Sequence, residues 1–166
     1  MGNYRRKFVP GGTYFFTARL RDRRSDLLVE RIDLLRHCVR LTQARHPFQI
    51  NSAVILPSKI HMIWTLPPDD LDFSARWRMI KSTFSRHVDR PTLGVTNPMR
   101  RRRDKGIWQP RFWEHLIRDQ HDYDLHDHLI ATAPLREGLI DAGSHWPYCS
   151  RFKRQQTRTA TVQSVA

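Results

Sequence analysis

The amino-acid sequence predicts an α+β fold of the ferredoxin-like kind, in which two helices cover one face of an antiparallel sheet in the order β-α-β-β-α-β. Runs rich in β-branched and aromatic residues alternate with segments whose apolar residues recur at helical spacing, and two of these runs are joined by a short link. An additional C-terminal helical segment follows the last strand. We therefore expect a single domain over residues 1–150.

The first half of the chain supplies three strands and one helix. The first strand is expected over residues 11–20, where "GGTYFFTARL" combines a turn signal with β-branched and aromatic residues. A helix is predicted over residues 30–46 because its apolar residues form one broad face, and Pro47 ends it. Residues 48–57 and 59–67 indicate two strands, and the short link between them favours an antiparallel pair.

The second half begins with a helix that is predicted over residues 72–88 by its apolar periodicity. Residues 89–105 contain two prolines and four consecutive arginines, which is typical of an exposed basic loop. A bent strand is expected over residues 106–119, where Pro110 marks a sheet edge or a bulge.

The C-terminal part is expected to hold a third helix over residues 120–132 that ends before Pro134. Residues 151–166 form a basic tail that is expected to be disordered, since residues 153–166 contain no aromatic side chain. The two cysteines are too few for a disulfide framework or a zinc cluster. Cys38 lies on the apolar face of a predicted helix and is expected to be a small core residue.

The charge of the chain is strongly positive. Lys and Arg number 29 against 16 Asp and Glu, which gives a formal net charge of +13. This balance favours a polyanionic partner, and aromatic residues interleaved with arginines favour nucleic acid over a ribosome or an acidic membrane. No apolar run of about 18 residues exists for membrane insertion, and the N-terminus lacks an apolar signal core. We expect a cytoplasmic protein.

Several segments resemble the REP-associated tyrosine transposases, bacterial relatives of the single-tyrosine transposases of small insertion sequences. The resemblance covers roughly residues 3–150. In order, the segments are "NYRR", "GGTYFFT", "ARHPFQI", "ILPSKIHMIWTLP", "FSARWRMIKSTFSR", "GIWQPRFWEHLIRD" and "PLREGLI…WPYCS". "GIWQPRFWEHLIRD" is the most specific of these.

The resemblance implies a ferredoxin-like fold and a DNA partner, both hairpin and single-stranded, with a nucleoid-associated location. Family members cut single-stranded DNA beside a short hairpin, and a tyrosine attacks the phosphate to give a 5′-phosphotyrosine link. A His-hydrophobe-His pair holds magnesium or manganese, because alternate strand residues share one face. A polar residue four positions after the tyrosine is a further ligand. Both monomers and homodimers occur.

This chain departs from the family pattern at three catalytic positions. Laid on the family's His-hydrophobe-His, the strand gives Lys59 and His61, so one ligand has become lysine. The family's helix has approximately Asp-Tyr-Ile-x-x-Asn-Pro-Val-Lys-x-Gly, whereas this chain has "HLIATAPLREG". Leu129 therefore stands at the nucleophile position and Ala133 at the third ligand position, with the following proline and glycine keeping the register.

These exchanges predict lost or impaired cleavage. Leucine has no nucleophilic atom, alanine no ligand atom, and a lysine ammonium no lone pair. Lys59 is placed to put its charge where the metal sat and to touch a phosphate, or else to reach solvent from a strand end. Tyr123 is a weak substitute nucleophile, because six residues from Leu129 is about 120° around a helix.

Other polar and aromatic residues admit two interpretations. The helix 120–132 carries a group of acidic and imidazole side chains that suggests a metal site: His121, Asp122, Asp124, His126, Asp127 and His128. With no ligand identifiable outside the helix, we favour a solvated helix face. His115 is expected to be hydrogen-bonded and partly buried. Core packing is expected for Trp77 and Trp113, and packing in the core or at its rim for Tyr14 and Tyr148.

The DNA-binding residues are expected in two groups. The N-terminal Asn3, Tyr4, Arg5 and Arg6 resemble the family segment that meets the tetranucleotide at the foot of the hairpin, where Tyr4 is suited to stack on a base. The other candidates are Lys59, Arg76, Lys81, Arg86, Arg100, Arg101, Arg102, Arg103, Trp108 and Arg111. For any single arginine the alternative is an ordinary solvated charge. The sequence leaves the role of Trp108 open.

We therefore interpret the chain as a transposase-family protein that binds hairpin and single-stranded DNA at short palindromic repeats. The alternatives are an active, metal-dependent single-strand transposase or endonuclease and an RNA-binding accessory protein.

Overall fold

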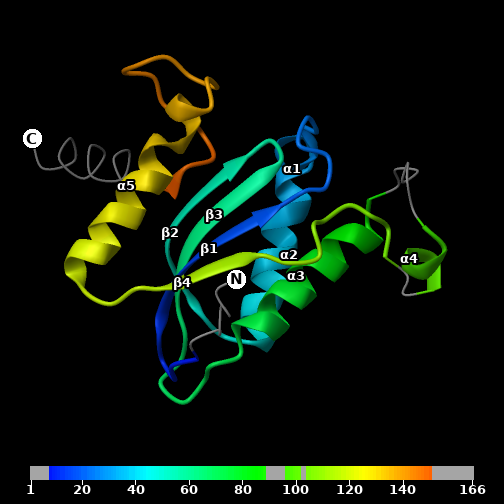
Figure 1. Cartoon of the computed structure of the whole chain (residues 1–166), viewed down its shortest axis with the longest axis horizontal. Helices are drawn as coiled ribbons and strands as arrows, with labels where there is room; N and C mark the ends of the chain where they lie inside the picture. Colours follow the sequence, from blue (N-terminus) through cyan, green and yellow to red (C-terminus); the bar gives the residue numbers. More distant parts are fainter. Residues whose placement is uncertain (1–7, 89–95, 102–103, 151–166) are drawn as a thin grey trace, which may run out of the picture.

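The computed structural model describes residues 8–88, 96–101 and 104–150, and its centre is a four-stranded antiparallel sheet (Figure 1). Its strands are β1 (Thr13–Arg19), β2 (Gln49–Leu56), β3 (Lys59–Thr65) and β4 (Trp113–Leu116). They are arranged in the order β2-β3-β1-β4, and every neighbouring pair is antiparallel. This is the split β-α-β arrangement, so the predicted ferredoxin-like fold is confirmed.

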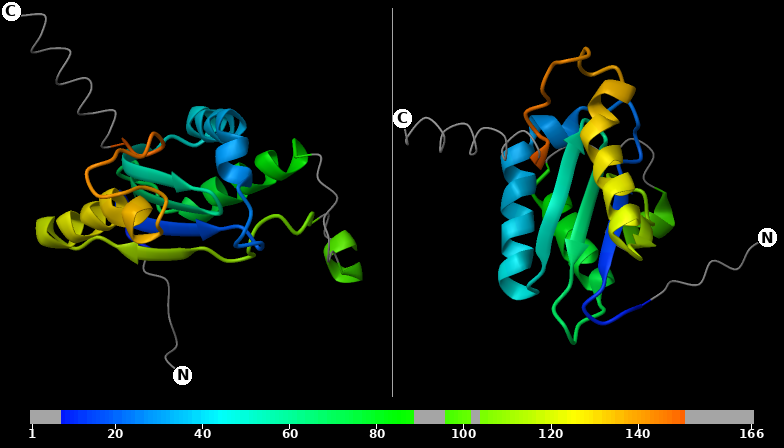
Figure 2. Two further views of the ribbon diagram at one scale, coloured as in Figure 1. Left: turned by 90° about the horizontal axis from the view of Figure 1, so that it is seen from above. Right: turned by 90° about the vertical axis from the view of Figure 1, so that its left-hand side faces the viewer.

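Helices lie on both faces of this sheet. The described helices are α1 (Leu27–Glu30), α2 (Ile32–Arg45), α3 (Phe73–Arg86), α4 (Asn97–Arg101) and α5 (Gln120–Arg136), of which α4 lies apart from the sheet (Figure 1). Helices α2 and α3 form a layer over one face, and α5 crosses the opposite face (Figure 2). Each face of the sheet therefore has its own apolar cluster.

The central strands β1 and β3 are buried almost along their whole length. Tyr14 and Phe16 pack into the cluster beneath α2 and α3, whereas Phe15 between them packs with residues of α5. Successive strand residues point to opposite faces. Because both faces are covered, these strands show continuous apolar runs instead of an alternation of apolar and polar residues.

Two predicted segments differ from the structure in their boundaries. The helix expected over residues 30–46 is α2, which a separate short helix, α1, precedes, with Arg31 in a non-helical conformation between them. Leu27 and Leu28 of α1 are buried, so the bend brings both helices onto the sheet. The expected loop over residues 89–105 contains the short helix α4, with the gaps in the described ranges on either side of it.

The bent strand expected over residues 106–119 is regular only in β4. A separate bridge pairs Trp108 with Leu20 just beyond the end of β1, so the chain leaves the sheet around Pro110 and returns to it at Trp113. Pro110 has no N–H to offer a ladder. The position of β4 at the edge of the sheet agrees with that expectation.

The prediction that the last helix ends before Pro134 is wrong, because α5 continues to Arg136. The helix ends in the usual hydrogen-bonded pair around a left-handed glycine: Gly138, with φ +68°, donates to the Leu135 carbonyl, and Leu139 donates to that of Pro134. These bonds stabilise a last turn that carries the proline.

The remaining sequence expectations concern cysteines, the tail and membranes. Cys38 is buried in the core, as predicted, and Cys149 is also buried; both thiols are free. The tail over residues 151–166 lies outside the described residues. Within the described ranges, every helix is too short or too polar to cross a bilayer.

Candidate nucleic-acid interface

Lys59 and His61 lie on the face of β3 that α5 covers, as the alternation of a strand requires. The Nζ atom of Lys59 donates a hydrogen bond to a carboxylate oxygen of Glu137, which caps the C-terminal end of α5. Both side chains keep some contact with water, so this ion pair adds little stability. It nevertheless provides Lys59 with an anionic partner, and a phosphate would compete with Glu137 for it.

His61 is only 6% exposed and is held as a neutral ring. Its Nδ1 atom lies 2.8 Å from the Thr17 hydroxyl oxygen, and the ring stacks on Phe15 with 5.5 Å between centroids. Burial, followed by the positive charges of Lys59 and two arginines, lowers the pKa of His61 to about 3. The same surroundings that disfavour an imidazolium disfavour a bound cation.

The two helix positions of the family's catalytic set are apolar in space as well as in sequence. Ala133 is buried in the cluster between α5 and the sheet, and Leu129 packs against the same cluster. The four family positions therefore present one buried imidazole, one paired ammonium and two hydrocarbon side chains. These residues do not fit a divalent magnesium or manganese ion, which prefers several oxygen ligands.

Tyr123 is half-buried and packs against the cluster that also receives Leu129. Its side chain lies on the side of α5 that meets the sheet, but it is about 1.7 helical turns along the axis from Leu129 at the nucleophile position. The structure thus gives Tyr123 a packing role; whether it attacks DNA stays a prediction.

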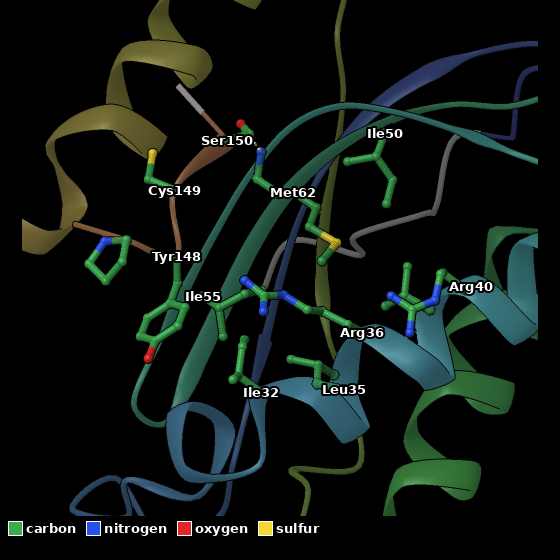
Figure 3. Close-up of a pocket in the computed structure, with 13 residues that line it drawn as sticks. Ile32, Leu35, Arg36, Arg40, Ile50, Ile55, Met62, Tyr148, Cys149 and Ser150 are labelled. Atoms are coloured by element: carbon green, nitrogen blue, oxygen red, sulfur yellow. Dashed lines mark hydrogen bonds between the residues drawn. The ribbon is translucent and has the colours of Figure 1, made fainter. Parts of the chain in front are cut away.

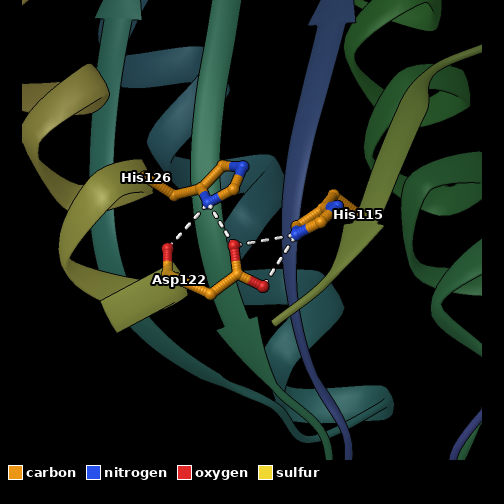
Figure 4. A group of neighbouring side chains, drawn as sticks. All are labelled: His115, Asp122 and His126. Carbon is orange, nitrogen blue, oxygen red and sulfur yellow. Dashed lines mark hydrogen bonds and ion pairs between the residues drawn. The ribbon is translucent and has the colours of Figure 1, made fainter. Parts of the chain in front are cut away.

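The face of α5 that the sequence suggested to be solvated is in part buried, which corrects that interpretation. His115 comes from β4 and meets Asp122 and His126 of α5 (Figure 4). The Nε2 atom of His115 lies 3.0 and 2.9 Å from the two carboxylate oxygens of Asp122, and His126 Nδ1 lies 3.2 Å from one of them. His115 can act as a metal ligand and comes from outside the helix. Nothing in the sequence indicates that it lies beside Asp122 and His126.

Asp122 is almost completely buried, and its hydrogen bonds are what keep the carboxylate ionised there. Burial opposes ionisation, but hydrogen bonds from His115 and from the Arg118 main chain and guanidinium hold the pKa of Asp122 well below its usual range. Asp127 is buried too and accepts a hydrogen bond from Ser52 at 2.5 Å. Asp124, in contrast, is exposed and bonds to Gln120 one turn earlier.

The group His115, Asp122 and His126 has the composition of a metal site, since its ligand atoms lie within 4.8 Å of one another. The hydrogen bonds favour another role. His126 Nδ1 lies 2.8 Å from the Asp122 main-chain carbonyl, which can only accept, so this nitrogen carries a proton. His115 Nε2 donates to an ionised carboxylate for the same reason. The three residues therefore form a hydrogen-bonded clamp between β4 and α5.

A basic groove of about 710 Å³ lies between α3 and the segment that leads into β4. We define the basic groove by its five cationic residues: Arg78, Lys81, Arg86, Lys105 and Arg111. Its floor is aromatic, and among the described residues Asp104 is the acidic side chain on its wall. Three residues predicted to bind DNA, Lys81, Arg86 and Arg111, are thus brought together from two separate segments. Several positive side chains around one groove suit a phosphate backbone.

Lys81 is held in the basic groove by a hydrogen bond and two aromatic rings. Its Nζ donates to the main-chain carbonyl of Gln109 at 2.9 Å and lies 5.9 and 5.6 Å from the ring centroids of Trp108 and Phe112. Burial lowers the pKa of Lys81 to about 8, although Asp104 works in the opposite direction. The charge is therefore held in a fixed place and titrates close to physiological pH.

Several expected DNA contacts are placed differently by the structure. Arg76 is only 1% exposed, so its predicted surface position is wrong; it forms a bidentate pair with Asp70 and donates to the Pro47 carbonyl. Trp108 is buried and packs edge-on against Phe84, which leaves no open ring face for a base.

Other candidates lie at the limits of the described residues. Arg101 of α4 is exposed. The side chain of Arg100 and the whole of Arg102 and Arg103 lie outside the described part, as do the N-terminal candidates Asn3, Tyr4, Arg5 and Arg6. Trp77 and Tyr14 are core residues and Tyr148 lies at the rim of the core, all as predicted.

Three features were not predicted from the sequence: Arg78 and Lys105 in the basic groove, and the exposure of Trp113. Arg78, Lys81, Ser82 and Ser85 recur at helical spacing, so a polar stripe along α3 was readable as one wall of a groove. Trp113 was expected in the core but is 49% exposed. Its neighbour Phe112 packs under α3, and because strand residues alternate, Trp113 points to the opposite face.

A second, apolar pocket of about 290 Å³ lies between α2, β2 and the segment after Pro147 (Figure 3). Arg36 and Tyr148 face each other across its mouth, with the guanidinium carbon 6.0 Å from the ring centroid. Among the described residues, its walls carry no nucleophile beside a base and no group of metal ligands. We treat it as a packing defect where the C-terminal segment meets the core.

The fold and the basic groove define the chain as a ferredoxin-like protein with a cationic surface on its two-helix side. Over 158 residues it is 44% identical to the REP-associated tyrosine transposase of Escherichia coli K12, covering 95% of this chain and 87% of the relative. A Haemophilus influenzae protein described under the same family name is 37% identical over 150 residues, or 90% and 85% of the two chains.

The structural comparison agrees. A solved REP-associated tyrosine transposase bound to a REP hairpin superposes with a TM-score of 0.79 at 42% identity, covering 96% of this chain and 87% of that one. No protein-family model matches the chain. The chain belongs to the REP-associated tyrosine transposases.

Proposed function

We propose that this chain binds DNA that combines a short palindromic hairpin with a single-stranded flank, and that it does not cut this DNA by the metal-and-tyrosine route. One contrast carries the proposal: five cations line the basic groove, while hydrocarbon side chains occupy the nucleophile and third-ligand positions. A relative of known structure was solved with a REP hairpin. A protein with this activity would be found with the nucleoid.

The basic groove supports the binding half of the proposal through its charge and its shape. Its cations come from α3 and from residues 104–112, so they flank the groove on two sides and can neutralise successive phosphates. A protein that neutralises four phosphates releases counterions when it binds. Raising the salt concentration from 50 to 200 mM should therefore weaken its binding on the order of a hundredfold. The N-terminal segment remains a candidate for contact with the foot of the hairpin, with Tyr4 suited to stack on a base and Arg5 to bind a phosphate.

The non-cutting half of the proposal rests on the surroundings of His61. One buried imidazole cannot hold a divalent ion against the nearby charge of Lys59, and the leucine at the nucleophile position offers no oxygen for attack. The Lys59–Glu137 pair instead ties β3 to the end of α5. The region that carries out cleavage in the family would then serve as a structural part of a binding protein.

A salt titration with matched variants tests binding. Fluorescence anisotropy with a flanked hairpin oligonucleotide is measured for wild type, Arg78→Ala and Arg40→Ala; both arginines are exposed on helices, but only Arg78 lines the basic groove. Losing one phosphate contact should reduce the slope of log affinity against log salt by about 0.7–0.9 for Arg78→Ala, with no change for Arg40→Ala. Equal slopes in all three proteins, or stronger binding to RNA of the same sequence, would contradict the proposal.

A covalent-adduct assay tests the loss of cleavage. Wild type incubated with flanked hairpin DNA and manganese should give no protein–DNA adduct on a denaturing gel. The triple variant Lys59→His, Leu129→Tyr, Ala133→Asn restores the family pattern and serves as the positive comparison. An adduct with wild type that disappears in Tyr123→Phe would show instead that the phenol of α5 is a nucleophile and that the chain is an active enzyme.

A further inference from the structure

Trp113 presents an open aromatic face at the edge of the sheet. It is the first residue of β4, an edge strand, and 49% of its surface is exposed, whereas Trp64, Trp77 and Trp108 are buried. A single exposed apolar residue is ordinary. What distinguishes Trp113 is the way in which its ring is held in place.

The indole of Trp113 is the outer member of a stack of rings. It lies nearly parallel to the ring of His115, with 8° between planes and 5.9 Å between centroids, and His115 stacks on His126 at 4.5 Å. The buried carboxylate of Asp122 binds both imidazoles, and the Phe15 ring packs edge-on against the indole. The clamp between β4 and α5 therefore fixes the orientation of the exposed ring, which reduces the entropy lost when a ligand stacks on it.

The charges around this ring select the class of ligand. Arg111 precedes it by two residues and lines the basic groove, and Arg118, whose side chain is 71% exposed, lies beyond the other end of β4. An indole with cations on both sides suits an unpaired nucleobase whose neighbouring phosphates meet the arginines. A protein partner would need a wider apolar surface around the ring.

The position of Trp113 connects it with the basic groove. Phe112 lines the groove on the α3 side, and the next residue, Trp113, points to the α5 side of the same edge strand. A DNA strand that leaves the groove past Arg111 therefore reaches Trp113 by passing over the outer edge of β4.

We propose that Trp113 is a base-stacking site for the single-stranded flank of the DNA, and that His115 is its positioning residue through the Asp122 clamp. This inference rests on the proposed function, because it assumes that the basic groove holds the adjacent phosphates. It adds a ligand contact on the α5 face, at a residue that the family comparison does not assign.

The test compares a hairpin that carries a single-stranded flank with the same hairpin lacking it. Trp113→Ala should bind the flanked hairpin about 5- to 150-fold more weakly than wild type, the range for losing one stacked base, and the flankless hairpin equally well. Trp113→Phe should recover most of the affinity. Leu125→Ala removes another exposed apolar side chain, on α5, and should change neither affinity.

A 2-aminopurine placed along the flank gives a direct readout. Its fluorescence should be quenched by wild type and Trp113→Phe, remain high with Trp113→Ala, and be quenched only partly by His115→Ala, which loosens the stack without removing the indole. Equal affinities of Trp113→Ala and wild type for the flanked hairpin, or an equal loss for both DNAs, would overturn the stacking site while leaving hairpin binding established. Failure of wild type to bind either DNA would instead overturn the proposed function together with this inference.

Discussion

Lowering the pH from 7 to 5 is expected to destabilise the folded chain by about 2 kcal/mol through His61 alone. Burial lowers the pKa of His61 in the folded protein to about 3, against 6.5 for an ordinary imidazole. Between these two values the unfolded chain binds a proton that the folded chain does not, so stability falls as the pH falls. At 1.36 kcal/mol per pH unit, the interval from 6.5 down to 5 corresponds to about 2 kcal/mol.

The magnitude can be measured as a difference between two proteins. His61→Gln keeps a polar group near the Thr17 hydroxyl but cannot titrate, so its stability should lack this contribution. Urea unfolding of both proteins at pH 7, 6 and 5, followed by the fluorescence of buried tryptophans, gives the two pH profiles. Other acidic and basic groups contribute equally to both and cancel in the comparison.

Wild type should lose about 2 kcal/mol more than His61→Gln over this range, most of it below pH 6.5. Parallel profiles would mean that His61 titrates normally and is open to solvent. His61 would then be available as a metal ligand, contrary to the proposed function. Adding manganese at pH 7 provides a check, since we expect no increase in the stability of wild type.

Three further predictions follow from other buried or half-buried charges. DNA affinity should fall by up to about tenfold between pH 7 and 9, because Lys81, whose pKa is lowered to about 8, loses its charge in this range. Lys81→Arg should abolish this pH dependence. A wild-type affinity that does not change with pH would contradict the prediction. Arg76→Ala should lower the free energy of unfolding by about 2–4 kcal/mol in urea titrations, because it leaves Asp70 without its ion-pair partner and removes a buried side chain. A loss of DNA affinity without a loss of stability would indicate that Arg76 contacts DNA, as the sequence suggested. Asp122→Asn should lose about 2 kcal/mol near pH 7 in the same titration. Since the folded pKa of Asp122 is depressed, its contribution is present above the unfolded pKa near 3.9 and disappears at lower pH, so wild type and Asp122→Asn should converge in acid, and a gap that stays constant would exclude this origin.

The residues that the sequence placed correctly are those whose position follows from a local period. The alternation of β3 put Lys59 and His61 on one face, whereas Leu129 and Ala133 were matched to the family's catalytic positions by resemblance and not by a period. A hydrophobic period reports which side of an element faces a core. It gave the sheet order only with the help of a known arrangement of strands and helices.

The errors arose where the partner of a side chain comes from another structural element or from a loop. Arg76 resembled a surface cation because its pair with Asp70 depends on the loop before α3. Trp113 resembled a core residue because it lies in an aromatic segment, and the sequence gives no sign that the start of β4 is left uncovered. The clamp needed His115 from one element and Asp122 from another, and no spacing along a single helix indicates such a contact.

The sequence by itself determined the fold class and the positive charge, because these depend on residue identity and short-range period. It also gives a leucine at the position that the resemblance aligns with the family's tyrosine. The tertiary structure decided which cations share the basic groove, why His61 stays neutral and how an exposed indole is held. Burial and electrostatic fields are set by all elements packed around a group. For that reason they appear only when the chain is folded.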